Sequence, residues 1–271
     1  MELEKLLSSI SLKAIGREMG LDIRMTRGRL VCTPIAPNDP RHCTDFVMPS
    51  ARMVEACRAN DFSFFQPFID AGHLSVNQMH HAAARYCLGK TRSGRPMYWM
   101  MDDRRQPLDA HIGRDTWVSQ LLRQREPLLQ YWRPMHCLFG LHLLTEGADR
   151  ASAFARSYAT PRQTVCIVER EETAVVLSEL FPESLWMAYA TVEHLEIDLF
   201  APLEGCTVVL YPYTDPCQSN YLFFYDLATA VHKRYPSIHI TVDSFLEEQA
   251  SDEQKARGVD LLEYLQESLN P

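Results

Sequence analysis

Short apolar runs alternate with helix-like segments over the last hundred residues of the chain. Each run has about the length of a buried strand, and the runs occupy residues 164–168, 185–189, 206–211 and 238–242. Strands that alternate with helices form a parallel sheet whose two faces are covered by those helices. The pattern therefore predicts an α/β fold, with a C-terminal parallel sheet and flanking helices.

Three acidic residues stand at or just past the ends of these predicted strands: Glu169, Asp215 and Asp243. In parallel sheets the ligand site lies at the carboxyl ends of the strands. Carboxylates that gather there can hold Mg²⁺, which prefers hard oxygen ligands. An alternative is that each acid only caps the helix that follows it. The three acids are therefore candidate metal ligands, and Glu169 and Asp215 are candidate catalytic residues.

The chain before this sheet shows weaker and more mixed patterns. Apolar residues at helical spacing predict a helix over residues 3–19, and two short strands are predicted at 29–32 and 45–48. The pattern predicts a smaller α+β region here. The sequence thus divides into a mainly helical part with short strands, a basic part with a hairpin and helices, and the α/β part: residues 1–80, 81–160 and 161–271.

Residues 95–112 are predicted to form a hairpin that is rich in cations. The basic residues in and around it are Lys90, Arg92, Arg95, Arg104, Arg105 and Arg114. Together with Tyr98 and Trp99 they could bind the backbone of single-stranded nucleic acid and stack its bases. Because side chains alternate along a strand, at most one of the two rings can stack while the other packs inward. The alternative is an edge hairpin whose charges are merely solvated.

Charge is distributed unequally along the chain. Residues 1–160 hold 21 lysines and arginines against 16 acidic residues, whereas residues 161–271 hold 6 against 19. The basic part could meet phosphate, and the acidic part could hold a cation or a basic protein partner. The other explanation is that the acidic surface only keeps the protein soluble.

Composition argues against several classes of protein. No apolar run approaches the length of a membrane span, and the first residues do not form a signal peptide. The eight scattered cysteines suit reduced thiols in a cytoplasmic protein. Cys32, His42 and Cys43 are the candidate zinc ligands, but without a C-x-x-C pair zinc binding is not expected. The sequence shows no Ser-His-Asp or Cys-His arrangement, phosphate-binding glycine loop or H-E-x-x-H motif.

Several strings of residues, in this order and spacing, resemble uncharacterised proteins of bacterial mobile elements that carry a primase-like toprim domain. The strings are Tyr86–Gly89, Pro96–Asp102, Cys137–Leu144, Ile167–Ala174, Val208–Pro212 and Gly258–Leu265. The resemblance covers roughly residues 80–270. It implies a toprim-like sheet and a Mg²⁺ site made by a glutamate after the first strand and a pair of acids after a later one.

The chain departs from the toprim pattern at three places. Glu169 matches the glutamate, but Tyr213 stands where the later acid is expected, and Asp215 follows two residues on. Glu172 replaces a lysine, and the glycines expected after the second strand are missing from residues 188–192. A site with fewer carboxylates binds Mg²⁺ poorly because the ion keeps its water shell. The resemblance therefore implies a degenerate site, where Mg²⁺ binds weakly or not at all.

Three functions remain open from the sequence. The first in order is a non-catalytic toprim-like protein of a mobile element that binds nucleic acid or a replication protein. The second is a Mg²⁺-dependent enzyme of the primase or nuclease type, which would use Glu169 and Asp215, with Asp243 as a third ligand. The third is a regulatory module whose acidic face meets a basic protein. Whether the chain is an enzyme is left open, with an inactive nucleotidyl transferase or nuclease expected.

Overall fold

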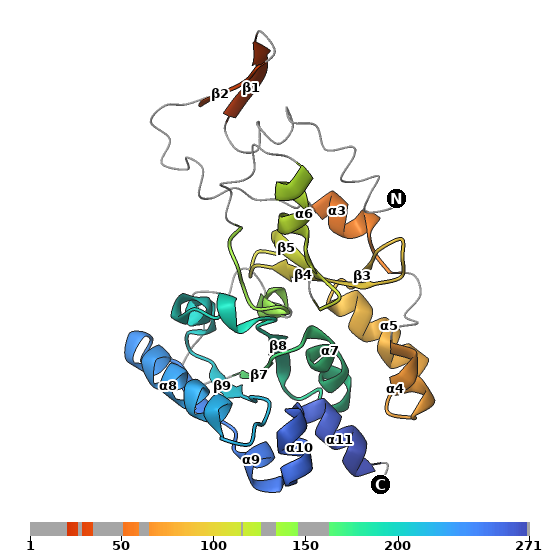
Figure 1. Cartoon of the computed structure of the whole chain (residues 1–271), viewed down its shortest axis with the longest axis vertical. Coiled ribbons are helices and arrows are strands. Elements are labelled where there is room, and N and C mark those ends of the chain that lie inside the picture. The colour runs from red at the N-terminus through yellow and green to blue at the C-terminus, as the bar shows by residue number, and fades with distance from the viewer. Residues whose placement is uncertain are drawn as a thin grey trace. The chain divides into compact units, whose positions relative to one another are not determined.

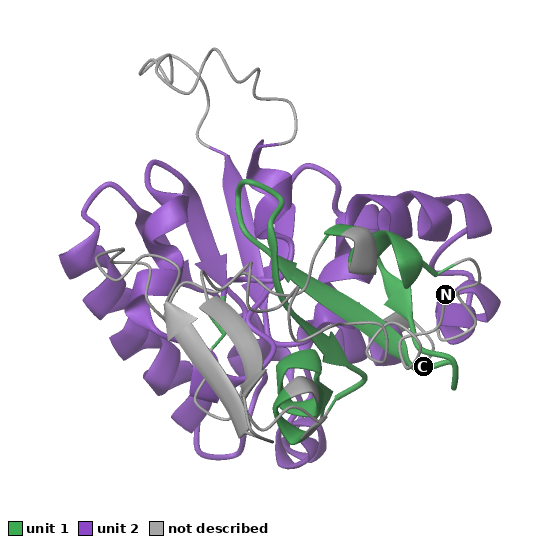
Figure 2. Cartoon of the chain, turned by 90° about the horizontal axis from the view of Figure 1, so that it is seen from above, with its two compact units in different colours: residues 1–64, 87–136 green, residues 65–86, 137–271 purple. Residues whose placement is uncertain are grey.

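A computed structural model of the chain describes residues 21–26, 29–34, 51–59, 65–114, 116–125, 134–145 and 163–269. Its contacts divide the chain into two compact units that are interleaved along the sequence (Figure 2). Unit 1 comprises Met1–Phe64 and Cys87–His136, and unit 2 comprises Phe65–Tyr86 and Cys137–Pro271. The division into residues 1–80, 81–160 and 161–271 stays a prediction.

Unit 2 is built on a four-stranded parallel sheet (Figure 1). Its strands, in the spatial order β10-β9-β7-β8, are β7 (Thr164–Val168), β8 (Leu185–Ala188), β9 (Thr207–Leu210) and β10 (His239–Val242). All three pairings are parallel. The predicted parallel sheet is therefore confirmed, with strand ends that differ from the prediction by two residues or fewer.

Position in the sheet explains the sequence of each strand. β7 lies between two strands, and its residues from Val165 to Val168 are all buried, as expected for a strand covered on both faces. β10 lies at an edge, and His239 and Thr241 alternate there with half-buried neighbours. Polar side chains on an edge strand discourage pairing with other chains.

Helices flank this sheet. Their bounds are α4 Gln66–Asp70, α5 Val76–Arg85, α7 Glu171–Leu180, α8 Ser219–Arg234, α9 Phe245–Gln249, α10 Asp252–Arg257 and α11 Leu261–Leu269, with the short 3₁₀ helices η3 Leu141–Thr145, η4 Val192–His194 and η5 Ile197–Leu203. In Figure 1, α7 and α8 lie on opposite sides of the strands. α7 packs on β7 and β8 and against α5 and α11, while α8 packs on β10 and η5.

The other edge of the sheet is closed by Phe139. Its N–H donates to the carbonyl of Ala188 at 2.8 Å, and the N–H of Ala188 donates back at 3.1 Å. Gly140 follows with a positive φ of 85°, and an added Cβ there would lie 3.0 Å from the carbonyl oxygen of Trp186. Phe139 thus forms an isolated bridge to β8, and η3 follows it.

Unit 1 contains two antiparallel sheets. The two-stranded sheet pairs β1 (Leu21–Thr26) with β2 (Arg29–Pro34), and the other sheet has the order β3-β4-β5-β6, with β3 Gly89–Lys90, β4 Pro96–Met101, β5 Pro107–Ile112 and β6 Thr116–Trp117. Its described helices are α3 (Ala51–Ala56) and α6 (Val118–Arg125). The predicted hairpin is confirmed as β4 and β5. The predicted strand at 29–32 pairs with β1, while the predicted helix over 3–19 and the predicted strand at 45–48 lie outside the described residues.

The core of unit 1 includes a fully buried carboxylate on β5. Asp109 has no exposed surface, and its Oδ1 accepts the N–H groups of Ala110 at 2.8 Å and of Ser119 at 3.0 Å. Ser119 lies in the first turn of α6, so Asp109 anchors that helix to the sheet. Its Oδ2 has no hydrogen-bond partner among the described residues. Burial raises the pKa of Asp109 from 3.8 to about 6.

Two further features concern the helices and the cysteines. Among the helices that the structure describes, none combines the length and the apolar character needed to cross a membrane. The described cysteines 57, 87, 137, 166, 206 and 217 carry free thiols.

Candidate functional site

Glu169 lies directly after β7, at the carboxyl edge of the parallel sheet, and its side chain is half-buried. Burial raises the pKa of Glu169, the neighbouring Arg170 opposes this shift, and the nearby acids Asp260, Glu171 and Glu193 add to it. Of these acids, Asp260 has the largest effect on the pKa of Glu169. Asp260 is not one of the strand-end aspartates that the sequence pattern predicted.

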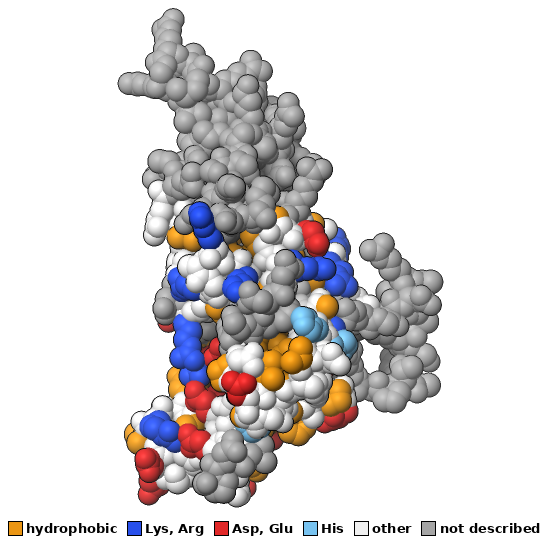
Figure 3. All heavy atoms as spheres, turned by 90° about the vertical axis from the view of Figure 1, so that its right-hand side faces the viewer, with side chains coloured by type: hydrophobic (Ala, Val, Ile, Leu, Met, Phe, Trp, Pro, Cys, Tyr) orange, Lys and Arg blue, Asp and Glu red, His pale blue; other side chains and the backbone are white. Residues whose placement is uncertain are grey.

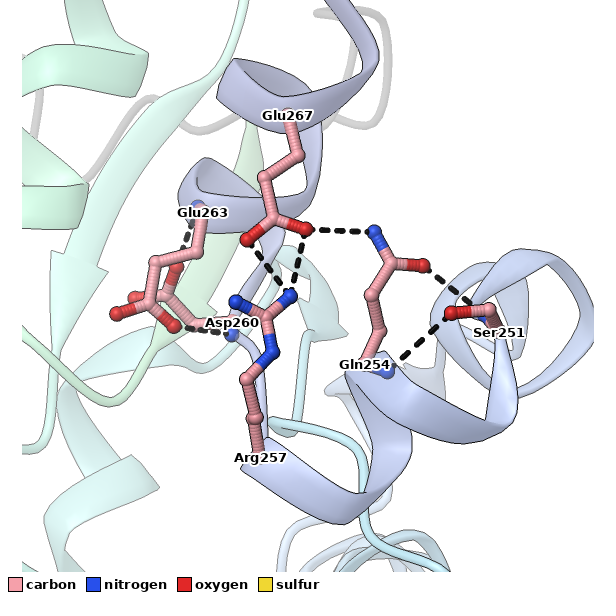
Figure 4. Close-up of polar contacts among 6 residues, drawn as sticks. All are labelled: Ser251, Gln254, Arg257, Asp260, Glu263 and Glu267. Atoms are coloured by element: carbon pink, nitrogen blue, oxygen red, sulfur yellow. Dashed lines mark hydrogen bonds and ion pairs between the residues drawn. The ribbon is translucent and has the colours of Figure 1, made fainter. Parts of the chain in front are cut away.

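Asp260 is a buried carboxylate that precedes α11 and is 5% exposed. Its Oδ2 accepts the hydroxyl of Thr173 at 2.7 Å, and its Oδ1 accepts the N–H of Glu263 at 2.8 Å. The N–H of Asp260 donates in return to Glu263 Oε2 at 3.1 Å, which completes a capping box like the one between Ser251 and Gln254 in α10 (Figure 4). The carboxylate thus fixes the start of α11 and ties it to α7.

Arg170 supplies the cation beside these acids. Its Nη1 lies 2.6 Å from Glu263 Oε1 and 3.9 Å from Asp260 Oδ2. Burial raises the pKa of Asp260, while the bonds from Glu263 and Thr173 and the charge of Arg170 hold the rise back. Arg170 is therefore a counter-ion shared by Glu263 and Asp260.

The loop after β9 is fixed against the loop that leads to Asp260. The N–H of Thr214 donates to the carbonyl of Val259 at 3.1 Å, and the Thr214 hydroxyl donates to Glu247 Oε1 at 2.9 Å. Gly258 has a positive φ of 67°, and a Cβ added there would lie 3.7 Å from the ring of Tyr213. This contact places Tyr213 beside the loop that carries Asp260.

Two tyrosines complete this edge of the sheet. The hydroxyl of Tyr189 is buried and has no hydrogen-bond partner among the described residues. Burial raises its pKa well above the ordinary value, and Glu169, Tyr213 and Asp260 add to the shift. Burial also raises the pKa of Tyr213, with Glu169 the next cause and Asp215 a further one. Tyr213 therefore lies within the electrostatic reach of both acids that the sequence predicts as catalytic.

The carboxylate of Asp215 is hydrogen-bonded to the start of α8. Its two carboxylate oxygens accept the N–H groups of Cys217 at 2.9 Å, Ser219 at 3.2 Å and Asn220 at 2.8 Å, and the Ser219 hydroxyl at 2.9 Å. Burial pulls the pKa of Asp215 upward, but these hydrogen bonds outweigh it, so the pKa lies below its ordinary value. One oxygen of Asp243 accepts the N–H of Phe245, the first residue of α9, at 2.9 Å. Both acids thus bond the first turn of the helix that follows them, and their roles as catalytic residues and metal ligands stay predictions.

These residues do not fit a Mg²⁺ site. Within the described part of the chain, no group of three or more His, Cys, Asp or Glu side chains could hold a metal ion. Mg²⁺ needs free carboxylate oxygens in near-octahedral geometry. Here Asp215 gives both oxygens and Asp243 gives one oxygen to backbone N–H groups, and Asp260 gives its oxygens to Thr173 and Glu263. This edge of the sheet therefore carries an acidic cluster, Glu169 and Asp260, with Tyr189 and Tyr213 beside it and Arg170 as its cation.

The hairpin of unit 1 carries its aromatic rings inside the unit. Tyr98 is 2% exposed and Trp99 is fully buried, because both faces of β4 are covered. Neither ring is therefore exposed for base stacking. Alternation put the two rings on opposite faces, but it could not show that the second face is also covered.

The arginines of the hairpin are exposed but do not form one cluster. Arg92 and Arg95 lie before β4, and Arg104 and Arg105 lie in the turn after it, so the six residues of β4, about 20 Å of strand, separate them. Arg95 also has a structural role, since its Nη2 donates to the carbonyl of Ile112 at 2.9 Å. On the face drawn in Figure 3, Lys and Arg side chains form several separate groups.

The candidate zinc ligands receive no further support. Cys32 lies in β2, where only the backbone is described, and His42 and Cys43 lie outside the described residues.

Sequence reasoning missed Asp260 and Tyr189. Asp260 does not follow a strand, so the rule on strand ends could not find it. Two signals were present: the string Gly258–Leu265, already part of the toprim resemblance, and the pattern Asp260-x-x-Glu263 of a capping box. Tyr189 ends an apolar run and carried no signal beyond that position.

Three solved structures are similar to this chain. The DnaG primase catalytic domain bound to ssDNA has 14% identity and a TM-score of 0.39, over 80% of this chain and 81% of that one. The E. coli primase catalytic core has 14% identity and a TM-score of 0.37, over 77% of each chain. The DnaG catalytic core has 14% identity and a TM-score of 0.38, over 81% of this chain and 80% of that one.

A comparison with curated proteins found no match. The family model described as "Domain of unknown function (DUF6371)" matches residues 63–214. Since that match spans more than half of the 271 residues, the chain belongs to the DUF6371 family.

Proposed function

We propose that this chain is a toprim-like protein of a mobile element that has lost metal-dependent catalysis and binds single-stranded nucleic acid or a replication protein. One observation carries the proposal. The toprim resemblance calls for an acid after β9, but Tyr213 stands at that position. The next acid, Asp215, has both carboxylate oxygens hydrogen-bonded to N–H groups at the start of α8.

The charges at the sheet edge support the proposed loss of catalysis. A toprim site needs several carboxylates whose oxygens are free for Mg²⁺. Glu169 remains, but Asp260 is bonded to Thr173 and Glu263, and Arg170 lies beside both acids. A positive guanidinium within this cluster opposes the binding of a divalent cation by direct repulsion.

Titration calorimetry with Mg²⁺ and Mn²⁺ tests the loss of the metal site. We expect no saturable binding at micromolar concentrations, and the same result for Glu169→Gln. Micromolar binding that Glu169→Gln abolishes would show an intact site and favour the alternative, a Mg²⁺-dependent primase or nuclease.

Binding of nucleic acid is proposed for the exposed arginines of unit 1. Arg92, Arg104 and Arg105 are exposed at the two ends of β4. Each cation that neutralises a phosphate releases a counterion, so affinity should fall steeply with salt. Because Tyr98 and Trp99 are buried, base stacking should contribute little, and the binding should show little preference for sequence.

Fluorescence anisotropy with a labelled single strand at low and moderate salt tests this part. The variant Arg92→Ala/Arg104→Ala/Arg105→Ala keeps Arg95, whose guanidinium holds the carbonyl of Ile112. It should lose binding at least about tenfold. A matched control makes the same change of charge in unit 2, at the exposed Lys233, Arg234 and Arg257. Equal losses in both triple variants, or no binding by the wild type at low salt, would count against this part of the proposal.

A further inference from the structure

Helix α8 exposes large apolar side chains on the face that would ordinarily be polar. Leu222 is 57% exposed, Phe223 43% and Tyr225 58%. The opposite face of the same helix, with Phe224, Ala228 and Val231, is buried on the sheet, as in any helix that covers a sheet. Over its first half, α8 is therefore apolar on both sides. Adjacent exposed apolar side chains of this size mark an interaction site.

The charges around this apolar patch, defined as Leu222, Phe223 and Tyr225, are negative. Asp226 lies four residues after Leu222 and so on the same face of the helix, and it is exposed. Asp215 lies at the N-terminus of α8. The basic residues of α8, from His232 onward, stand at its far end, about 10 Å from Tyr225 along the axis. A partner that covers the patch thus meets carboxylates at its rim.

Packed rings in the interior of unit 2 link the apolar patch to the acidic cluster at the end of β7. Phe223 packs edge-on against Phe224, with ring centroids 5.3 Å apart, and Phe224 lies 5.4 Å from the ring of Tyr189. The side chain of Asn220, in the first turn of α8, bonds Tyr213. Both tyrosines lie within the electrostatic reach of Glu169. The exposed apolar side chains and the half-buried Glu169 are therefore linked through buried rings, and Arg170 beside Glu169 is held by Glu263.

We propose that the apolar patch of α8 and the acidic cluster form a docking surface for a basic amphipathic segment of a partner protein. The partner's apolar side chains cover Leu222, Phe223 and Tyr225, and its lysines or arginines face the exposed Asp226 and the half-buried Glu169. This names the chemistry of the replication partner in the proposed function, and it rests on that function in one respect, since a metal ion at Glu169 would compete with a cationic side chain.

Charge decides between this partner and a second copy of the chain. A two-fold symmetric contact through the same patch would place Asp226 of each copy close to the other copy's acids. Like charges that are brought together at an interface oppose association. The stretch around the patch, residues 161–271, holds 6 basic residues against 19 acidic ones, a formal balance of −13, so a basic partner gains where a second copy loses.

The test uses the full chain and a synthetic labelled peptide, because the natural partner is not identified. The peptide is a helix of about 18 residues, five turns, with leucines along one face and lysines and arginines elsewhere. Fluorescence anisotropy should show binding that weakens with salt. Leu222→Ser/Phe223→Ser/Tyr225→Ser should weaken it at least about tenfold, and Asp226→Lys should weaken it several-fold. All four side chains are exposed, so the fold should persist, which urea unfolding of each variant checks.

Matched controls separate docking from general stickiness. Val76→Ser removes an apolar side chain that is 54% exposed on α5 and should change nothing. A peptide of the same composition, scrambled so that it has no apolar face, should bind at least about tenfold more weakly. The proposal is overturned if the wild type does not bind, if the triple variant or the scrambled peptide binds equally well, or if light scattering shows a dimer that the triple variant dissociates. Loss of single-strand binding with intact peptide binding, or the reverse, shows which of the two proposals has failed.

Discussion

Among the residues that the structure describes, each unit of this protein buries one aspartate, and the two differ in their hydrogen bonds. Asp260 in unit 2 has both carboxylate oxygens hydrogen-bonded and Arg170 nearby. Asp109 in unit 1 is buried still further, yet its Oδ2 has no hydrogen-bond partner among the described residues. A buried polar group costs free energy mainly when its bonds are not made. The comparison teaches that burial alone does not identify a functional acid, since the partners decide what the acid contributes.

The largest effect should come from removing the fully bonded aspartate. Asp260→Ala leaves the hydroxyl of Thr173 and the N–H of Glu263 without their acceptor and leaves Arg170 short of one counter-charge. We expect a loss of about 3–5 kcal/mol in the free energy of unfolding, measured by urea denaturation.

The control for Asp260→Ala is Ser251→Ala, which removes the exposed cap of α10 in the same kind of capping box. It should cost about 1 kcal/mol. Equal losses in the two variants would mean that Asp260 is only a cap and that its bonds to α7 contribute little.

The second effect concerns pH and the incompletely bonded aspartate. The pKa of Asp109 is about 6 in the folded state against 3.8 ordinarily, so the folded protein binds this proton more tightly. The stability that this provides is present below pH 4 and is lost as pH rises to 6, by about 3 kcal/mol at most. Asp109→Asn keeps an oxygen for the two N–H bonds but does not titrate.

The difference between wild type and Asp109→Asn isolates this residue, because Glu169 and Asp260 titrate in both proteins. Urea unfolding between pH 4 and pH 7 should show the wild type losing stability relative to the variant. Curves that stay parallel over this range would mean that the Asp109 carboxylate is solvated or paired in solution.

The smallest effect is expected when Asp260 loses the hydrogen bond to one oxygen, as Asp109 lacks one. Thr173→Val removes the hydroxyl that donates to Oδ2 at 2.7 Å while keeping the shape of the side chain. We expect a loss of about 1–2 kcal/mol. Because that hydroxyl stabilises the charged form, the loss should become smaller as pH falls through the raised pKa of Asp260.

Thr229→Val is the matched control for Thr173→Val. Thr229 is exposed, and its hydroxyl bonds only the carbonyl of Tyr225 in the same helix. This change should stay within about 0.5 kcal/mol. A loss at Thr173 that does not depend on pH would argue that the hydroxyl acts through packing rather than through the charge of Asp260.

The parallel sheet could be predicted from sequence because its strands are continuous apolar runs between helices. β7 is the clearest case, with four consecutive buried residues followed at once by Glu169. The order of the strands could not be predicted, since periodicity reports burial and not which strands are neighbours.

The candidate site was predicted in part. Glu169 could be predicted because it follows a strand. Its strongest acidic neighbour, Asp260, lies in a loop some ninety residues later in the sequence, and the two are close only in the folded chain. Asp215 and Asp243 stand at the predicted positions, yet the number of backbone N–H groups that each accepts depends on loop conformation, which residue type alone does not fix.

The interleaving of the two units has a consequence for how the chain is made. α5 belongs to unit 2 and packs on α7, and the hydroxyl of Tyr86 donates to the carbonyl of Trp186 at 2.8 Å. A ribosome releases α5 first, then the strands of unit 1, and only later α7. During synthesis α5 therefore lacks its packing partner α7 until the last hundred residues emerge. A recombinant fragment that begins at residue 161 would leave the matching face of α7 bare, so expression of unit 2 has to include residues 65–86.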